Sequence, residues 1–384
     1  MSGWPDDVPE LSGGRVRLRA HQGADHEAMV EMCQDPITRR WASNLPDPYR
    51  LADAEWFVRE VVSAGWDAGT AFGWAIEAAD QNGLPRYAGN LDLRGGPAST
   101  VGFLLHPWAR GQGIMSAALR LALHWCFSEA GVSMVTWESR VGNVASRRVA
   151  WAAGFTFHGT MPCLLKHAGP AVDAWVGTVT AGSTLRPQTR WLTPTVLSDE
   201  KVALRPHIEA DIPRVVEACS DTVTRHWLST LPTPYTTDSA RAYLDSMAVE
   251  ESLTRRVAWC IADPRTDLLL GTIAVFDLRG DDPSSGELGY WTHPAVRGRG
   301  VMTAAVRLVV NHALRPIGDG GIGLRRLQLL AAAGNIASAT IAKRTGFVEV
   351  GQERQAELLG DGSYDDLVTF DLLLGDVRGG TSPL

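Results

Sequence analysis

The segment with the clearest chemical meaning is Arg297–Met302, which reads Arg-Gly-Arg-Gly-Val-Met. A strand-like apolar segment leads into it through His293–Pro294, and a segment with helical apolar periodicity, Met302–Leu314, leaves it. Glycines let a backbone approach a ligand closely, and the first helical turn carries N–H groups without intrahelical partners. With the positive end of the helix dipole, these donors favour a phosphate or diphosphate. The same arrangement recurs at Arg110–Met115, which argues against a chance glycine cluster.

Two other phosphate-binding loops are excluded by the residues around these glycines. A Walker loop places Lys and then Ser or Thr after its second glycine, whereas Val301–Met302 and Ile114–Met115 stand there. A dinucleotide fingerprint requires a third glycine, which neither copy has. For one copy alone, an ordinary glycine turn before a helix remains the alternative.

Composition limits the classes of partner. The chain has 384 residues, enough for two domains, and a formal net charge of -7 without a basic stripe, which argues against nucleic acid. Its 5 cysteines show no metal-site spacing, so we expect reduced thiols and no metal. No apolar run is long enough to span a membrane, so we expect a cytoplasmic protein that does not contact membranes.

The second half of the chain repeats the first at a constant offset. Matching pairs are Leu18 and Leu204, Arg19 and Arg205, Asp25 and Asp211, Trp41 and Trp227, and Tyr49 and Tyr235. Further on, Asn143-x-x-Ser146 leads to Gly154–Phe155, and Asn335-x-x-Ser338 leads to Gly346–Phe347 at the same spacing. The length of the repeat indicates a duplicated domain, not a solenoid.

Each half reads as a strand, two helices, two strands, a strand–loop–helix unit, a strand–helix unit and a last strand. This order predicts an α+β fold. We expect a loose arm at residues 1–12, domains at 13–180 and 200–375, a linker at 181–199 and a disordered tail at 376–384. Asp25 is expected to cap the first helix, and Asp35 to Tyr49 to form a loop held by prolines.

The glycine loops resemble the coenzyme A loop of the GNAT N-acetyltransferases, whose pattern is Gln/Arg-x-x-Gly-x-Gly/Ala. Both copies follow it through Gly113 and Gly300 and depart at the last position, where Met115 and Met302 stand. The segments Leu204–Pro206, Leu231–Tyr235 and Gly289–Pro294 are similar to the subgroup of ribosomal-protein N-terminal acetyltransferases. The resemblance covers nearly the whole chain, twice. It implies two tandem GNAT domains, each with a mixed, mostly antiparallel sheet flanked by helices.

The resemblance implies acetyl-CoA as cofactor, with the diphosphate on the loop and the pantetheine arm along the strand before it. In the second half the implied cofactor-binding residues are Tyr290, Trp291, Thr292, Arg297, Gly298, Arg299, Gly300, Val301, Met302 and Asn335. In the first half they are Phe103, Leu104, Leu105, Arg110, Gly111, Gln112, Gly113, Ile114, Met115 and Asn143. Each Asn also suits a helix cap, and both roles are compatible.

The sequence leaves alternatives for the group that would protonate the leaving thiolate. Many GNAT enzymes carry a Tyr seven residues after the Asn, where this chain has Ala150 and Ala342. Ser146 and Ser338 are the hydroxyls at hand, and the resembling subgroup implies such a Ser as the donor. Alternatively, these serines pack or bond a carbonyl, and solvent protonates the thiolate directly.

The halves differ in their candidate bases. The second half has Glu287 before the loop, where the first has Thr100, and the first half has Glu138, where the second has Leu330. Solvated glutamates and an amine that loses its proton through ordered water are the alternatives. Asp365 is a candidate to orient the amine; further carboxylates of this kind are Asp173, Asp92 and Asp277, the last two also suited to turns.

We therefore expect an acetyl-CoA-dependent N-acetyltransferase that acts on a primary amine, of a small molecule or a peptide N-terminus, by direct attack in a ternary complex. The second half keeps the fuller pattern and is expected to be catalytic. A non-catalytic acyl-CoA-binding module, another acyl donor and an alcohol acceptor remain open. Trp41 and Trp227 would form an acceptor wall or pack in the core. Because family members often dimerise, we expect a monomer with paired halves or a homodimer.

Overall fold

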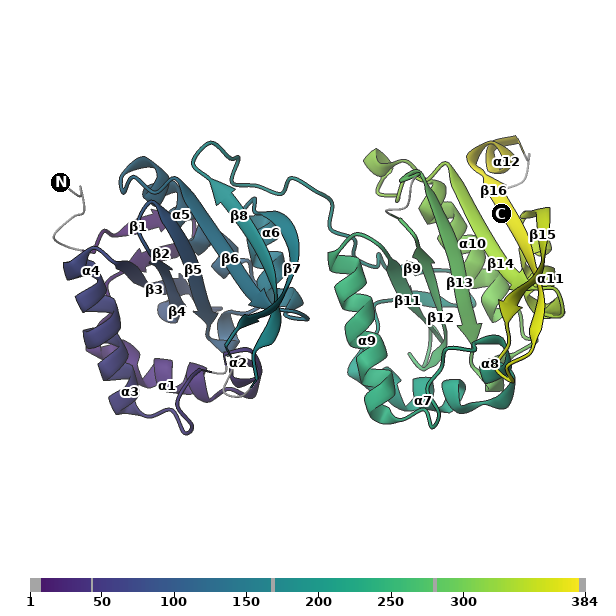
Figure 1. The fold of residues 1–384 in the computed structure, drawn as a ribbon, viewed down its shortest axis with the longest axis horizontal. Coiled ribbons are helices and arrows are strands. Elements are labelled where there is room, and N and C mark those ends of the chain that lie inside the picture. Colours follow the sequence, from purple (N-terminus) through teal and green to yellow (C-terminus); the bar gives the residue numbers. More distant parts are fainter. Residues whose placement is uncertain (1–7, 43, 167–169, 279–281, 380–384) are drawn as a thin grey trace. The chain divides into compact units, whose positions relative to one another are not determined.

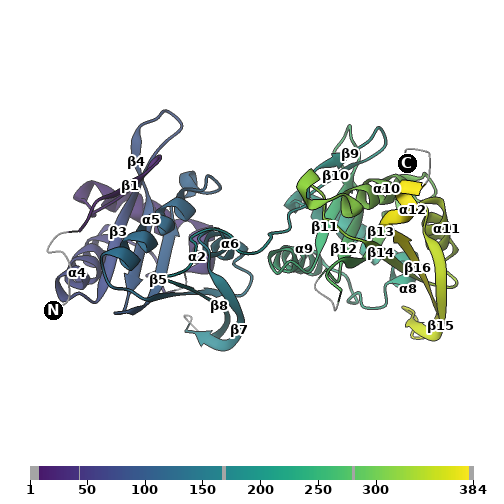
Figure 2. The same cartoon turned by 90° about the horizontal axis from the view of Figure 1, so that it is seen from above.

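The structure is a computed structural model that describes residues 8–42, 44–166, 170–278 and 282–379. The chain divides into two compact units, residues 1–190 and residues 191–384 (Figure 1). The division lies inside the segment that we expected to link two domains. Each unit is a sheet with helices on both faces, as Figure 2 shows from a second direction.

The first unit contains the following helices and strands in chain order. They are β1 (Leu11–Gly13), β2 (Val16–Arg19), α1 (His26–Gln34), α2 (Pro36–Trp41), α3 (Leu51–Trp56), the π-helical segment Phe57–Ser63, α4 (Ala64–Ala68), β3 (Ala71–Ala79), β4 (Pro85–Arg94), β5 (Ala98–Leu105), α5 (Ile114–Ser128), β6 (Met134–Arg140), α6 (Val144–Ala152), β7 (Thr156–Leu165) and β8 (Val172–Thr180).

The second unit repeats this order with one long helix, α9, in place of the three segments from α3 to α4. Its helices and strands are β9 (Leu197–Ser198), β10 (Ala203–Arg205), α7 (Ile212–Ser220), α8 (Thr222–Trp227), α9 (Thr237–Ser252), β11 (Val257–Ala262), β12 (Leu269–Phe276), β13 (Ser285–Thr292), α10 (Val301–Leu314), β14 (Arg326–Ala332), α11 (Ile336–Arg344), β15 (Val348–Leu358), β16 (Tyr364–Leu373) and α12 (Leu374–Gly379).

Each unit has an 8-stranded sheet, in the orders β1-β2-β3-β4-β5-β6-β8-β7 and β15-β16-β14-β13-β12-β11-β10-β9. Neighbouring strands are antiparallel except for the pairs β5–β6 and β13–β14. The expectation of two tandem α+β domains with mixed, mostly antiparallel sheets is confirmed.

The two parallel pairs separate along their length. Residues 285–287 of β13 pair with residues 326–328 of β14, and the described pairing between these strands stops there although both continue. In the first unit, residues 98–101 of β5 pair with residues 134–137 of β6 in the same way. Each sheet therefore opens beside the strand that leads into a glycine loop.

The helix that follows each glycine loop packs against the sheet through a stripe of apolar side chains. In α10 the buried residues recur at helical spacing: Val301, Met302, Ala305, Val306, Val309, Val310 and Ala313. They pack with strand residues such as Trp259 and Ile273. Full burial of one aliphatic side chain is worth ~1.5–3 kcal/mol, so this stripe holds the beginning of α10 firmly in place.

Several local predictions are wrong. Asp25 does not cap α1 with its side chain, because its carboxylate accepts hydrogen bonds from Nη1 and Nη2 of Arg19, at 2.8 and 2.9 Å, and from the N–H of Gln22. The expected loop from Asp35 contains helix α2, which Asp35 caps by accepting from the N–H of Thr38.

The chain ends also differ from the expectation where the structure describes them. Leu11 and Ser12 of the expected loose arm pair with β2, while residues 1–7 lie outside the described residues. The expected disordered tail begins inside helix α12, and residues 380–384 lie outside the described residues. None of the helices in the described part of the chain is both long and apolar enough to cross a bilayer.

Candidate active site

Both glycine loops have the backbone geometry of an anion site. Gly298 and Gly300 have φ of 73°, and Gly111 and Gly113 have φ of 72° and 74°. L side chains rarely adopt such angles. A Cβ on Gly298, Gly111 or Gly113 would meet no atom within 4 Å, so backbone conformation, not crowding, requires glycine there. The space in front of the loops is open to a ligand.

Helix α10 begins directly at the second loop. Gly300 is its N-cap, and the carbonyl of Gly300 accepts the bond from the N–H of Ala304. The N–H groups of Val301, Met302 and Thr303 precede that bond and belong to the first helical turn, whose donors have no partner inside a helix. Ile114 follows Gly113 in the same way at the start of α5.

The first arginine of each loop is an anchor within the protein. Arg297 donates from Nη2 to Asp221 Oδ2 at 2.5 Å and to Thr224 Oγ1 at 2.7 Å. Burial alone would raise the pKa of Asp221, but the bonds from Arg297 and from the N–H of Thr224 outweigh it and lower that pKa. Arg110 makes the equivalent bonds to Asp35 and Thr38. These arginines tie the loops to the N-termini of α8 and α2.

The middle residues of the loops differ between the units. Arg299 is exposed. Gln112 donates from Nε2 to the carbonyl of Trp108 at 2.6 Å. Of the two, only Arg299 therefore extends a cationic side chain into solvent beside its loop.

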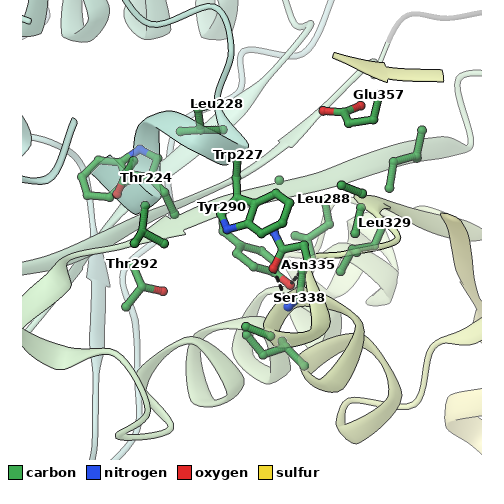
Figure 3. Close-up of a pocket in the computed structure, with 18 of the residues that line it drawn as sticks. Thr224, Trp227, Leu228, Leu288, Tyr290, Thr292, Leu329, Asn335, Ser338 and Glu357 are labelled. Atoms are coloured by element: carbon green, nitrogen blue, oxygen red, sulfur yellow. Dashed lines mark hydrogen bonds between the residues drawn. The ribbon is translucent and has the colours of Figure 1, made fainter. Parts of the chain in front are cut away.

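A cavity of about 360 Å³ opens between β13 and β14 in the second unit (Figure 3). The residues predicted from the sequence that line it are Glu287, Tyr290, Trp291, Thr292, Arg297, Asn335 and Ser338. Gly298, Arg299, Gly300, Val301 and Met302 do not line it and form the adjoining loop and helix start. The structure thus brings the candidate base, the candidate hydroxyl and the strand before the loop together.

The first unit has a cavity of about 420 Å³ in the matching place. The predicted residues that line it are Phe103, Leu104, Leu105, Arg110, Gly111, Gly113, Ile114, Met115, Asn143 and Ser146. Gln112 and Glu138 are not among its lining residues. Glu138 directly follows Trp137 on β6, and Trp137 is bonded to Ser146, so strand alternation directs Glu138 to the opposite face of the sheet.

Of these two cavities, as far as the described residues go, the second is lined by carboxylates and the first is not. Glu287 is half-buried, and burial, then the charges of Asp277 and Glu357, raises its pKa. Burial and Asp365 raise the pKa of Glu357, which also lines the cavity. Sequence reasoning missed Glu357, because the β15–β16 hairpin brings it to the site from far along the chain and no motif spacing marks it.

The other candidate aspartates have structural bonds. Asp365 accepts from the N–H groups of Gly334 and Asp366, so its carboxylate holds a turn and the role of orienting an amine is not supported. Asp173 accepts from the N–H of Cys163. Asp277 has φ of 56°, as a turn residue does.

The paired Asn and Ser positions show one shared bond and one difference. Asn335 accepts from the N–H of Ser338 at 3.1 Å, and Asn143 from that of Ser146 at 3.1 Å, so both Asn residues cap their helices. The Ser338 hydroxyl bonds the Tyr290 hydroxyl at 3.0 Å (Figure 3). The Ser146 hydroxyl instead accepts from Trp137 Nε1 at 3.0 Å.

The two repeated tryptophans reach the cavities from the short helices α2 and α8. Trp41 lines the first cavity and Trp227 lines the second. Each therefore forms part of a cavity wall, and the role of these walls in holding an acceptor stays a prediction. Within the described residues, no group of three or more His, Cys, Asp or Glu side chains is arranged to hold a metal ion.

The family description "Acetyltransferase (GNAT) domain" matches residues 15–156 and again residues 201–348. The chain belongs to the GNAT acetyltransferase family. Each match covers most of one compact unit, so the chain carries two GNAT domains in tandem. The departures from the GNAT loop pattern at Met115 and Met302 do not prevent the match.

Individual relatives support the same family. The "Putative ribosomal N-acetyltransferase YdaF" of Bacillus subtilis is 34% identical over 93 residues, which are 24% of this chain and 48% of that protein. The "Ribosomal-protein-serine acetyltransferase" of Escherichia coli is 31% identical over 103 residues, 27% of this chain and 54% of that protein. The chain thus spans about half the length of the curated relatives it matches.

Among solved structures, a similar one is that of RimL, described as a ribosomal L7/L12 alpha-N-protein acetyltransferase in complex with coenzyme A. It is 18% identical, with a TM-score of 0.42, and the similarity covers 47% of this chain and 98% of RimL.

Proposed function

We propose that this chain is an acetyl-CoA-dependent N-acetyltransferase whose C-terminal GNAT domain transfers the acetyl group to a primary amine. The observation that carries the proposal is that Glu287, the open edge of β13 and the glycine loop adjoin one cavity. The relatives named as ribosomal acetyltransferases support a peptide N-terminus as acceptor. A small-molecule amine is the alternative acceptor.

The glycine loop suits the diphosphate of acetyl-CoA, and the open edge of β13 suits its pantetheine arm. The N–H groups at the start of α10 would hold the diphosphate, and Lys201, whose Nζ lies 3.2 Å from where a Gly300 Cβ would be, adds positive charge beside them. The backbone of residues 288–292, which β14 leaves unpaired, would receive the pantetheine arm. Acetyl-CoA supplies the acyl carbon, activated as a thioester.

We assign the role of general base to Glu287. Burial, and then the charges of Asp277 and Glu357, raise its pKa, so it is a better proton acceptor than an exposed carboxylate. In a ternary complex the amine nitrogen would bond directly to the acyl carbon and lose a proton to Glu287. The carbon–sulfur bond would then break, and the thiolate would take a proton from water.

The N-terminal domain lacks this combination. Thr100 stands where Glu287 does, Glu138 is not among the lining residues, and the Ser146 hydroxyl accepts from Trp137. Its glycine loop and cavity are nevertheless compatible with coenzyme A binding. We therefore assign acetyl transfer to the C-terminal domain alone.

A thiol-release assay with acetyl-CoA tests this assignment. The acceptors are a panel of primary amines and short peptides, and the proteins are the wild type, Glu287→Gln and Glu138→Gln. We expect release with at least one acceptor, loss in Glu287→Gln and wild-type rates in Glu138→Gln. Binding of acetyl-CoA without release for any acceptor would replace the proposal by a non-catalytic binding module, and mass analysis of the product would reveal another acyl group or an alcohol acceptor.

A further inference from the structure

The hydroxyl pair of Tyr290 and Ser338 is the feature of the cavity that the proposed function does not use. Tyr290 reaches from β13 and Ser338 from the first turn of α11, and their oxygens lie 3.0 Å apart. Both residues line the cavity between β13 and β14. In Figure 3 the Tyr290 ring points toward Ser338 and Asn335.

Tyr290 and Glu287 lie on opposite faces of β13. Successive side chains of a strand alternate, so positions 287 and 290 point to different sides. Packing supports this: Tyr290 contacts the core that contains α10, whereas Trp291, on the Glu287 side, contacts the core formed with α7 and α9. A group held in the opening beside β13 would therefore meet a carboxylate from one side and a phenol from the other.

This arrangement suits a reaction in which the amine nitrogen bonds to the acyl carbon while the sulfur leaves that carbon. The amine approaches the acyl carbon on one side, and the sulfur departs on the other with the electron pair of the broken carbon–sulfur bond. Negative charge that develops on the departing atom is stabilised by a preorganised hydrogen-bond donor. On the α11 side of the cavity, the Tyr290 hydroxyl is such a donor.

We propose, on the basis of the proposed function, that the Tyr290 hydroxyl donates a hydrogen bond to the departing sulfur and that Ser338 is the positioning residue that holds it. The nitrogen–carbon bond forms and the carbon–sulfur bond breaks. The amine proton passes through Glu287 to water, and the released thiolate takes a proton from water. Tyr290 keeps its proton throughout, so no further reactant is needed.

The electrostatics of the phenol agree with donation without proton loss. Burial raises the pKa of Tyr290 to about 12, although the bond with Ser338 works in the opposite direction. A thiol has a pKa of ~8.5, so complete transfer of the phenol proton to a thiolate would be unfavourable. A hydrogen bond that stabilises the thiolate requires no such transfer.

The N-terminal domain lacks the phenol at the matching position. Phe103 stands there, and Trp137, where the second half has Leu329, donates to Ser146 instead. The serine hydroxyl therefore has a side-chain partner in each domain: Tyr290 bonds Ser338 in the C-terminal domain, and Trp137 bonds Ser146 in the N-terminal domain. Among the described residues, Tyr290 lines the cavity of the C-terminal domain, whereas no tyrosine lines that of the N-terminal domain. Phe103 also shows that this fold accommodates a phenylalanine at the position.

The test compares Tyr290→Phe, Ser338→Ala and the double variant with the wild type in thiol release. The probes are acetyl-CoA and the panel amine that the wild type uses fastest. We expect Tyr290→Phe to lower kcat about 100-fold, with the KM for acetyl-CoA within threefold and the shape of the pH profile unchanged. Ser338→Ala should lower kcat about 10-fold, and the double variant should have the same kcat as Tyr290→Phe. Tyr364→Phe, which removes an exposed hydroxyl on β16, is the matched control.

Three results would overturn the inference: Tyr290→Phe within twofold of the wild type, Ser338→Ala at least as damaging as Tyr290→Phe, or a loss that lies in KM alone. The second would make Ser338 the donor. Thermal melting checks folding, and if Tyr290→Phe does not fold, Ser338→Ala decides by whether kcat falls with KM unchanged. Absence of thiol release by the wild type would instead contradict the proposed function itself.

Discussion

Asp221 Oδ2 lies 2.5 Å from Arg297 Nη2, and this ion pair fixes the first residue of the second glycine loop to the N-terminus of α8. Asp35 and Arg110 form the same pair at 2.6 Å in the first unit. Although the family pattern suggests a phosphate ligand at this arginine, its bonds position the loop. The two domains share this anchor while their candidate catalytic residues differ.

Loss of the anchor should weaken cofactor binding and stability together. Asp221→Asn should reduce the affinity for acetyl-CoA, because the loop is no longer held, and should destabilise the protein by about 1 kcal/mol at pH 7. Calorimetric titration and thermal melting measure the two effects. The matched variant Asp35→Asn should show a similar stability loss with unchanged turnover. Unaltered binding by Asp221→Asn would show that the anchor is dispensable.

The same pair predicts a pH dependence of stability. The folded-state pKa of Asp221 is lowered from 3.8, so its contribution is present above that pH and is lost as the pH falls through the lower folded-state value. The melting-temperature difference between the wild type and Asp221→Asn should be constant from pH 5 to pH 7 and shrink below pH 3.8. A difference that stays the same into strong acid would contradict the ion pair.

Glu287 should set the acid limb of the rate profile. Its pKa is raised from 4.5 by burial and by the neighbouring charges of Asp277 and Glu357. As the pH is lowered, kcat/KM should therefore decrease with a midpoint above pH 4.5. Glu287→Gln should lower kcat about 100-fold. Glu357→Gln removes one of these charges and should move the limb toward lower pH. A limb that does not move would mean that another group titrates.

The Glu287 carboxylate should also destabilise the folded protein at neutral pH. A group with a raised folded-state pKa contributes stability below its unfolded-state pKa, and that contribution is lost as the pH rises through the folded-state value. Glu287→Gln should therefore melt at a higher temperature than the wild type at pH 7, with the gain disappearing below pH 4.5. Lower melting at pH 7 would show that the charged form has a favourable partner.

Ser146 should be structural where Ser338 acts in the site. Trp137 is 1% exposed and donates to Ser146, so Ser146→Ala leaves a buried N–H without this acceptor. We expect a loss of ~1–3 kcal/mol in stability and unchanged thiol release. Ser338→Ala should instead reduce thiol release and change stability little. Reduced turnover in Ser146→Ala would indicate a catalytic role for the N-terminal domain.

The sequence predicted the features that depend on local pattern. Glycines at positive φ before an apolar helix, and Asn three residues before Ser, specify their own geometry, and the duplication strengthened both signals. Contacts between distant segments were not predictable in this way. Glu357 reaches the cavity through a hairpin, and the bond between Tyr290 and Ser338 joins two elements separated by 48 positions. Asp25 was assigned to a cap because its ion pair with Arg19 forms only when β2 and the following turn meet.

The most direct test of the central claim is calorimetric titration of the full chain with acetyl-CoA, comparing the wild type with the Gly298→Ala/Gly300→Ala variant. Each alanine would have to adopt φ near 73°, which costs an L residue ~1–2 kcal/mol and would displace the N–H groups that hold the diphosphate. We predict saturable binding by the wild type and loss, or weakening by at least about 10-fold, of one site in the variant. Absence of binding by the wild type, or wild-type affinity and stoichiometry in the variant, would contradict the account.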